Sequence, residues 1–135
     1  MEFSKLLIAT FVGLGLGSLP DRFFGGVLFH EKYKAYPEVW RRPEGGPGEN
    51  RAIALSVALS LLTYFGFAYL YAASGIHGWW ASLRIATAVW LLAPLPILAT
   101  HALWAKIHPA LVVSHSLGWL VKLWVAAIAA AWILK

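Results

Sequence analysis

Four long apolar runs, each almost free of charge, determine most of what this chain can fold into. They cover residues 3–29, 52–74, 78–105 and 110–134. Because a helix rises about 1.5 Å per residue, about 20 apolar residues cross roughly 30 Å of hydrocarbon, and each run reaches that length. The chain is 60% hydrophobic and 13% charged, far from the balance of a soluble domain. The remaining residues are too few to form a separate soluble core.

We therefore predict an all-α fold, a single polytopic membrane domain over residues 1–135 with four transmembrane helices in an up-down bundle. The expected spans are about 4–29, 52–74, 79–105 and 110–134, joined by a basic cytoplasmic loop at 30–51. Proline and glycine recur in that loop, where they break helices and favour turns. The partners expected first are therefore membrane lipids.

Basic residues divide unevenly between the two sides of this arrangement. The loop side holds six of them: Lys32, Lys34, Arg41, Arg42, Arg51 and Lys106. The other side holds Lys5, Lys135 and Arg84, the last of which can extend to the interface as an anchor. The positive-inside rule then places loop 30–51 in the cytoplasm and both termini outside, in a bacterial inner membrane. The net charge of +5 suits anionic lipid head groups, and we predict no nucleic-acid partner.

Several kinds of chemistry are excluded by what the chain lacks. It has no cysteine, which removes disulfides, thiolate metal sites and thiol catalysis. The run GLGLGS is not a dinucleotide-binding motif, because Ser18 occupies the third glycine position and no strand precedes it. Gly13 and Gly17 instead have the spacing that lets two membrane helices approach closely. The leading interpretation is accordingly a non-enzymatic membrane protein.

The last apolar run carries one full charge, Lys122, almost at its midpoint. A lysine at that depth is costly and marks a functional site in many membrane proteins. His115 lies one heptad earlier on the same helical face, so the two residues form a polar stripe. This stripe needs partners elsewhere in the bundle.

Asp21 and Arg22 follow Pro20 inside the first apolar run, and two alternatives remain open for them. The helix can end at Pro20, with the charged pair in the interface, or a kinked helix can continue to about Phe29. In the second alternative Asp21 comes within about one helical turn of the depth of Lys122. We then predict an ion pair between Asp21 and Lys122.

Two further spans carry polar features. Pro94 and Pro96 interrupt the third span, and their missing amide donors leave carbonyls near Trp90 and Leu92 without their usual partners. Such a kink can act as a hinge or as the wall of a polar cavity. In the second span, one helical face carries the hydroxyl residues Ser56, Ser60 and Thr63. We expect that face to turn toward the other helices and to form interhelical hydrogen bonds.

Histidines gather in the loop-side half of the predicted membrane: His30, His101, His108 and His115. In a hairpin centred on His108, His101 and His115 lie at about equal depth. Two such imidazoles could hold a haem iron, and three or four could hold a transition metal. Alternatively, each histidine bonds a carbonyl or hydroxyl group. The absence of a spacing such as H-E-x-x-H favours this second alternative, so no cofactor is predicted.

The glycine-rich first span leads into GGVLFHEKYKAYPEVWRR, and the last span reads SHSLGWLVKLWVAAIAAAWIL. On these segments the chain resembles a family of small bacterial and fungal four-span membrane proteins of unknown function. The resemblance covers the chain as a topology, and it departs from the family pattern around Pro20 to Arg22, where an aromatic pair is replaced. It implies the four-span fold and supplies no catalytic residues.

The leading hypothesis is a protein that binds or passes a small anionic or hydrophobic ligand through an intramembrane pocket formed by spans one, three and four. Lys122 would supply positive charge, Asp21 would balance it in the empty site, and His101 and His115 would donate hydrogen bonds. One alternative is a haem- or metal-binding redox subunit that uses His101 and His115. Another is a structural subunit, in a homo-oligomer or larger complex, whose Lys122 pairs with another chain. A proton relay through His115, Lys122 and Asp21 is a further possibility.

Overall fold

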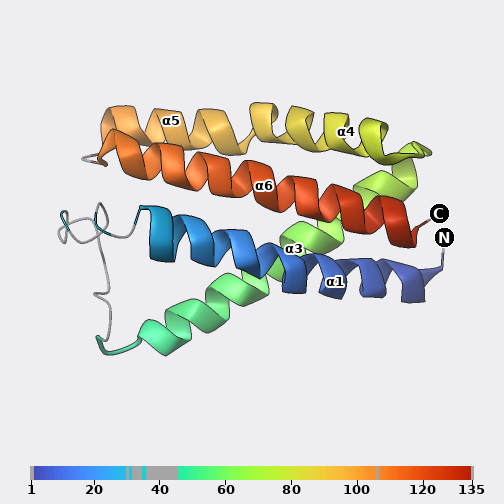
Figure 1. The fold of residues 1–135 in the computed structure, drawn as a ribbon, viewed down its shortest axis with the longest axis horizontal. Coiled ribbons are helices and arrows are strands. Elements are labelled where there is room, and N and C mark those ends of the chain that lie inside the picture. The colour runs from blue at the N-terminus through green and yellow to red at the C-terminus, as the bar shows by residue number, and fades with distance from the viewer. Residues whose placement is uncertain (1, 30, 32–34, 36–45, 106, 135) are drawn as a thin grey trace.

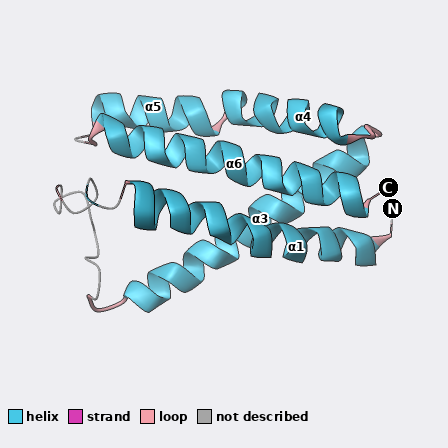
Figure 2. Cartoon of the chain, in the orientation of Figure 1, coloured by secondary structure: helices cyan, strands magenta, loops and turns pink. Residues whose placement is uncertain are grey.

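The computed structural model describes residues 2–29, 31, 35, 46–105 and 107–134, and within these residues it is helical with no β-strand. The elements are α1 (Phe3–Phe23), the π-helix η1 (Phe24–Leu28), α3 (Glu49–Ser74), α4 (Trp79–Leu92), α5 (Pro94–Trp104) and α6 (Pro109–Ile133) (Figures 1 and 2). Four segments are long and apolar enough to cross a membrane: Phe3–Pro20, Glu49–Ser74, Trp79–Trp104 and Pro109–Ile133. The predicted all-α fold with four membrane-spanning helices is confirmed, and it indicates a multi-pass membrane protein.

The helices run alternately up and down, with both chain termini at one end of the bundle (Figure 1). The end of η1, the start of α3 and the α5–α6 turn lie at the opposite end. Helix α6 packs against α1 on one side and against α4 and α5 on the other, while α3 crosses the bundle at an angle. Toward the end without the termini, α3 diverges from α1 and α6 (Figure 1). Helix α6 is therefore the central element.

The sequence of α6 explains why other helices can surround it. Its buried residues are Leu111, Ser114, Ser116, Gly118, Lys122, Leu123, Ala126, Ala127, Ala129, Ala130 and Ala131. Most of them are small, and small side chains let neighbouring backbones approach closely in a membrane, where dispersion contacts rather than hydrophobic exclusion hold helices together. The apolar cluster around these alanines includes Tyr64, Phe67 and Tyr71 of α3. This apolar cluster thus lies between α6, α3 and α4, and a second one joins Leu6 and Ala9 of α1 to Ala68 of α3.

The glycine pair of α1 forms the crossing point with α3. Tyr64 is 2% exposed and its ring lies against Gly13 and Gly17. A Cβ atom at Gly13 would lie 2.7 Å from Tyr64 Cδ1, and one at Gly17 would overlap the Tyr64 hydroxyl oxygen. Gly15, on another face of the same helix, has no neighbour within 4 Å of such an atom. The predicted close approach therefore depends on Gly13 and Gly17 specifically.

The first span follows the continuous alternative at Pro20. Helix α1 runs through Pro20 to Phe23 and passes into η1, in which the Phe29 amide donates to the Phe24 carbonyl at 3.1 Å. Proline cannot donate the usual helical hydrogen bond, and neighbouring structure in a membrane bundle can tolerate that loss. Asp21 and Arg22 consequently continue the same helix beyond the apolar span Phe3–Pro20.

The third span is divided at Ala93. Helix α4 ends at Leu92 and α5 begins at Pro94, with Ala93 between them at φ −131° and ψ −69°. Pro94 occupies the first position of α5, where its fixed φ and missing amide donor are tolerated. The Ala93 amide still donates to the Val89 carbonyl at 3.1 Å, so the two helices remain joined end to end. The interruption expected from Pro94 is present.

Candidate functional site

Lys122 lies near the middle of α6 and is only 9% exposed. Its Nζ donates to Ser60 Oγ of α3 at 3.4 Å and lies 5.1 Å from the centroid of the Trp119 ring. A cation over an indole ring is stabilised by about 0.5–2 kcal/mol, most when it is shielded from water. The ammonium group therefore has both a hydroxyl partner from another helix and an aromatic partner from its own.

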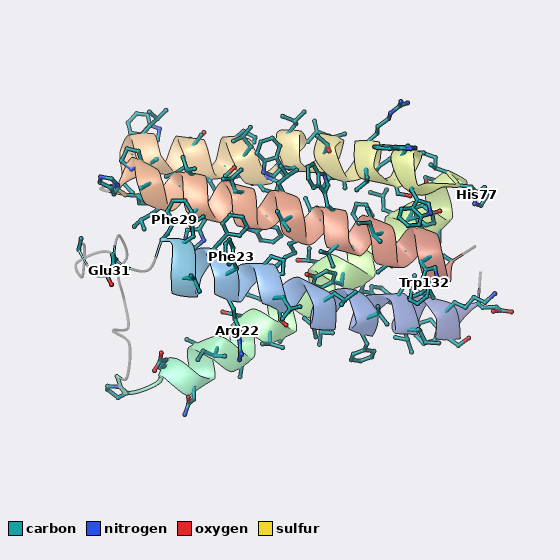
Figure 3. The ribbon with its side chains drawn as sticks, viewed as in Figure 1. Arg22, Phe23, Phe29, Glu31, His77 and Trp132 are labelled. Atoms are coloured by element: carbon teal, nitrogen blue, oxygen red, sulfur yellow. The ribbon has the colours of Figure 1, made fainter. Side chains whose placement is uncertain are left out.

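Asp21, the predicted counter-ion, lies on α1, which packs against α6. Its side chain is outside the described residues, so the predicted ion pair between Asp21 and Lys122 stays a prediction. The continuous helix through Pro20 is the arrangement that this prediction required. Arg22, the next residue, has an exposed side chain that leaves α1 on the side of α3 (Figure 3).

The described histidines that were expected near Lys122 lie mostly at the surface or at a helix end. The side chains of His101 on α5 and His115 on α6 are both exposed. His108 instead caps α6, because its Nδ1 accepts from the Ala110 amide at 3.1 Å. Lys122 is buried, whereas His115, one heptad earlier on α6, is exposed. The polar stripe predicted for the two residues is therefore buried at Lys122 and exposed at His115.

The described histidines do not assemble a metal centre. Within the part of the chain that the structure describes, no group of three or more His, Cys, Asp or Glu side chains could hold a metal ion. His30 lies outside the described residues. The haem or metal alternative therefore stays a prediction, with His101 and His115 on the surface rather than in the core.

An apolar cavity of about 450 Å³ lies beside Trp119. Its walls come from α3, α4, α5 and α6, and the lining residues are Leu62, Thr63, Gly66, Phe67, Leu70, Val89, Ala93, Pro94, Ile97, Leu98, Trp119 and Leu123. Leu62, Leu70 and Ile97 are 67%, 42% and 53% exposed, so the cavity opens sideways to the surface of the bundle. Its volume falls within the roughly 300–1,000 Å³ typical of ligand sites. In a membrane, this opening would face lipid.

The cavity differs from the pocket expected from the sequence. Spans two, three and four form it, whereas spans one, three and four were expected, because α3 rather than α1 passes beside the break in the third span. Pro94 does form part of its wall. Lys122 does not line it directly; Trp119 does, and the Lys122 ammonium lies over the same indole ring. The charged group and the cavity thus share one aromatic side chain.

Polar groups on α3 lie between the Lys122 ammonium group and the cavity. Ser60 contacts Lys122 Nζ, and Thr63, one turn later, lines the cavity while its hydroxyl donates to the Leu59 carbonyl at 3.3 Å. The Ser56 hydroxyl is exposed and donates to the Ala52 carbonyl at 2.9 Å. Of the three hydroxyls predicted to face other helices, Ser60 contacts another helix through Lys122, whereas Ser56 and Thr63 bond to carbonyls of their own helix.

Sequence reasoning missed Trp119 as a site residue. The signal was available, because Trp119 and Lys122 are three residues apart and therefore neighbours on a helix surface. Two other tryptophans use their indole groups: Trp90 Nε1 donates to the Ser116 carbonyl at 2.8 Å, and Trp124 Nε1 donates to Thr87 Oγ1 at 3.0 Å. These two hold α4 against α6.

Arg84 occupies a different place. It is exposed, and it lines a shallow hollow between α4 and α6 together with Trp80 and Trp124. The α3–α4 turn that carries His77 lies at the same end of the bundle (Figure 3). This position fits the anchoring role predicted for Arg84 rather than a role beside Lys122.

Comparison with known proteins supplies a family but no activity. No curated protein and no solved structure matches the chain. A family model described as "Protein of unknown function (DUF1761)" matches residues 4–131, a range that includes both Lys122 and the whole lining of the cavity. This agrees with the resemblance to a family of unknown function drawn from the first and last spans. The chain belongs to the DUF1761 family of proteins of unknown function.

Proposed function

We propose that this protein binds or passes a small amphiphilic ligand at an intramembrane site formed by Lys122, Trp119 and the adjoining cavity. One observation carries the proposal: a single indole ring contacts both a buried ammonium group and an apolar cavity that opens to the lipid side. Charged residues inside a membrane bundle are costly and mark ligand or ion pathways by default. No covalent chemistry is proposed.

The surroundings of the site define the chemistry of its ligand. The cavity lining is apolar except for Thr63, which suits a hydrocarbon tail, whereas Lys122 suits an anionic head such as a carboxylate. Ser60 and Thr63 lie one turn apart on α3, so a ligand in the cavity could place its head along this polar edge and reach Nζ. At 3.4 Å the bond between Lys122 and Ser60 is long, and a carboxylate would be a stronger acceptor. Asp21 is the proposed counter-ion of the empty site.

The structural-subunit alternative has less support. It requires Lys122 to pair with another chain, but Lys122 is 9% exposed and already contacts Ser60 and Trp119 of its own chain. A partner could reach the ammonium group only if α3 or α6 moved. The ligand hypothesis requires no such movement, because the cavity is open.

The proposal includes an orientation in a bacterial inner membrane, with both termini outside and loop 30–51 in the cytoplasm. The uneven distribution of basic residues supports it, as does the common end of the two termini (Figure 1). The absence of native cysteine permits a direct test with single-cysteine variants. An impermeant maleimide added to intact cells should label His77→Cys, in the α3–α4 turn, and not Pro47→Cys, before α3. The reverse labelling would invert the orientation.

Laurate and its methyl ester test the ligand site, because the two share a tail and differ in charge. Binding to the detergent-purified protein would be followed as the ligand-dependent rise in melting temperature. We expect laurate to bind the parent at least about tenfold more tightly than methyl laurate, and Lys122→Met to remove this difference. Lys5→Met, which changes an exposed lysine near the N-terminus, is the matched control and should leave both affinities unchanged.

A second variant keeps the test decisive if Lys122→Met does not fold. Thr63→Leu adds bulk to the cavity wall and leaves the charge in place, so it should weaken laurate and methyl laurate by a similar factor. If laurate and its ester bind the parent equally, or if Thr63→Leu affects neither, the proposed ligand site is wrong.

A further inference from the structure

We propose that helix α5 is a lid, which swings about Ala93 and closes over the ligand cavity beside Trp119. The inference rests on the ligand site proposed above and adds a moving part to that site. Three features carry it: a break in the third span at the edge of the cavity, the weak attachment of α5 to the bundle, and a cavity wall to which both sides of the break contribute.

The break at Ala93 gives α5 a pivot. Ala93 has φ −131° and ψ −69°, outside the helical region, and the first residues of α5 include Pro94 and Pro96. Neither proline has an amide hydrogen, so two carbonyls at the end of α4 lose the donors that a continuous helix would supply. The Ala93 amide still donates to the Val89 carbonyl at 3.1 Å, which keeps the two helices joined. A hinge is typically formed by a few such residues at the end of a helix.

The two helices that meet at the break are attached to the bundle differently. Helix α4 buries Ser82 and Ala86 completely, and its Trp90 indole donates to a carbonyl of α6. Helix α5 buries no residue. Within the part of the chain that the structure describes, no side chain of α5 forms a hydrogen bond or ion pair with another helix. The expected pivoting element is therefore α5, with α4 as its fixed base.

The far end of α5 is also free to turn. The residue after the helix, Ala105, has an extended backbone with φ −111° and ψ 151°. Leu103 and Trp104, in the last turn, are 82% and 88% exposed. A short helix with few buried contacts between two non-helical junctions belongs to the less stable part of a fold, from which moving elements are drawn.

The cavity lies where a movement of α5 would close it. Its wall includes Val89 of α4 and Pro94, Ile97 and Leu98 of α5, so the break itself lies in the wall. Ile97 of α5 and Leu62 of α3 are 53% and 67% exposed, which shows that these two helices border the opening. Rotation of α5 toward α3 would cover the opening with apolar side chains. A bound hydrocarbon tail would supply the contacts that α5 lacks and so favour the closed position.

Distances between pairs of spin labels, measured by pulsed EPR, test the lid directly, because the chain has no native cysteine. Leu103→Cys on α5 is paired with Leu55→Cys on α3, and both positions are exposed. The matched pair, at the end that contains the termini, is Trp80→Cys on α4 with Tyr69→Cys on α3, again exposed. In the full-length protein in detergent, we expect the α5–α3 distance distribution to be about twice as wide as the α4–α3 distribution.

Laurate and the hinge prolines should both change the α5–α3 distribution. Saturating laurate should narrow it to about half its width and move it to shorter distances, while the α4–α3 distribution stays the same. The double variant Pro94→Ala/Pro96→Ala restores both amide donors, so its α5–α3 distribution should be narrow and should not respond to laurate. Pro109→Ala, at the first position of α6, where no donor is needed, is the matched control and should behave as the parent. Pro96→Ala alone should narrow the distribution less, and it serves if the double variant does not fold.

The lid and the ligand site can fail separately. An α5–α3 distribution as narrow as the α4–α3 one, or one that the double variant leaves unchanged, would overturn the lid whatever laurate does. If laurate raises the melting temperature but does not alter the α5–α3 distances, the ligand site stands and the lid is wrong. If laurate does not raise the melting temperature while the distribution is wide and the double variant narrows it, the hinge is supported and the ligand site is wrong.

Discussion

The two halves of the bundle are packed differently. The half that contains the termini consists of residues 3–17, 64–74, 79–92 and 123–133, and every helix in it contributes buried residues. The other half, which we call the loop half, consists of residues 18–28, 49–63, 94–104 and 109–122. In the loop half, every described residue that is buried lies on α6. One half therefore supplies most of the contacts between helices, and the other is left open.

Helix α6 shows how one element serves both halves. Its last third carries the buried alanines that α3 and α4 pack against, while Trp119 and Lys122 lie where the packed half gives way to the open one. Functional regions are commonly drawn from the less stable parts of a fold. Lys122 therefore lies at the boundary between the two halves of the bundle. The packed half holds the backbone of α6 in place, and the open half leaves the surroundings of Lys122 accessible.

A leucine at an alanine of α6 should produce the largest difference between the halves. Ala130 is fully buried, so Ala130→Leu should lower the free energy of unfolding by about 3 kcal/mol through overpacking. Ala99, exposed on α5, is the matched control, and Ala99→Leu should change the free energy of unfolding by less than about 0.5 kcal/mol. Unfolding in mixed micelles with increasing SDS measures both. Similar losses at the two positions would mean that the halves are not packed differently.

The helix crossing at Tyr64 should give the next largest effect. Gly17→Ala places a methyl group where the Tyr64 hydroxyl lies, and we expect a loss of about 1–2 kcal/mol. Gly15→Ala on the same helix has open space around it and should gain up to about 1 kcal/mol from helix propensity. Thermal melts of the two variants give the comparison. If both substitutions had the same sign, the close contact between α1 and α3 would be wrong.

Hydrogen bonds between α4 and α6 should contribute less. Trp90→Phe removes the bond to the Ser116 carbonyl, which is part-buried, at an expected cost of about 1 kcal/mol. Trp124→Phe removes the bond to Thr87, which is exposed, and should cost about half as much. The same SDS titration measures both losses. A larger cost at Trp124 would contradict the expected order.

The smallest effect is expected at the hydroxyl beside Lys122. Ser60→Ala removes the 3.4 Å contact with Nζ and should cost about 0.6 kcal/mol, the average for interhelical hydrogen bonds in membranes. Ser56→Ala, one turn earlier, removes only a bond within its own helix and should cost nothing measurable. Thermal melts in detergent provide the readout. A cost above about 2 kcal/mol at Ser60 would show that Lys122 depends on this hydroxyl far more than its long distance indicates.

Much of the fold was predictable from the sequence because it follows from local composition. Run length predicts the four spans, the spacing of Gly13 and Gly17 predicts a close crossing, and Pro94 predicts the interruption at Ala93. The identity of Tyr64 as the residue in the glycine crossing was not predictable, because it depends on which helix packs there. The choice at Pro20 was also left open, since proline tolerance depends on neighbouring structure.

The site was predictable only in part. The depth of Lys122 in an apolar helix indicated that it needs a shielded position. Depth alone does not determine which way a helix turns each of its side chains. His101 and His115 were therefore expected in the pocket by depth, and both are exposed. Trp119 was missed because, from the sequence alone, its indole could not be related to a cavity formed by three other elements. Such a cavity exists only in the assembled bundle.

The central claim is that the bundle takes up an acidic amphiphile beside Trp119, at the boundary between its two halves, with the head of the ligand at Lys122. The most direct measurement uses a photoactivatable fatty acid, cross-linked to the detergent-purified protein and located by peptide mass spectrometry. We predict cross-links in the segments 62–70 and 93–98, which contribute nine of the residues that line the cavity, and their loss when excess laurate but not methyl laurate is added. Cross-links spread evenly over the exposed apolar faces of all helices, unaffected by laurate, would contradict the claim.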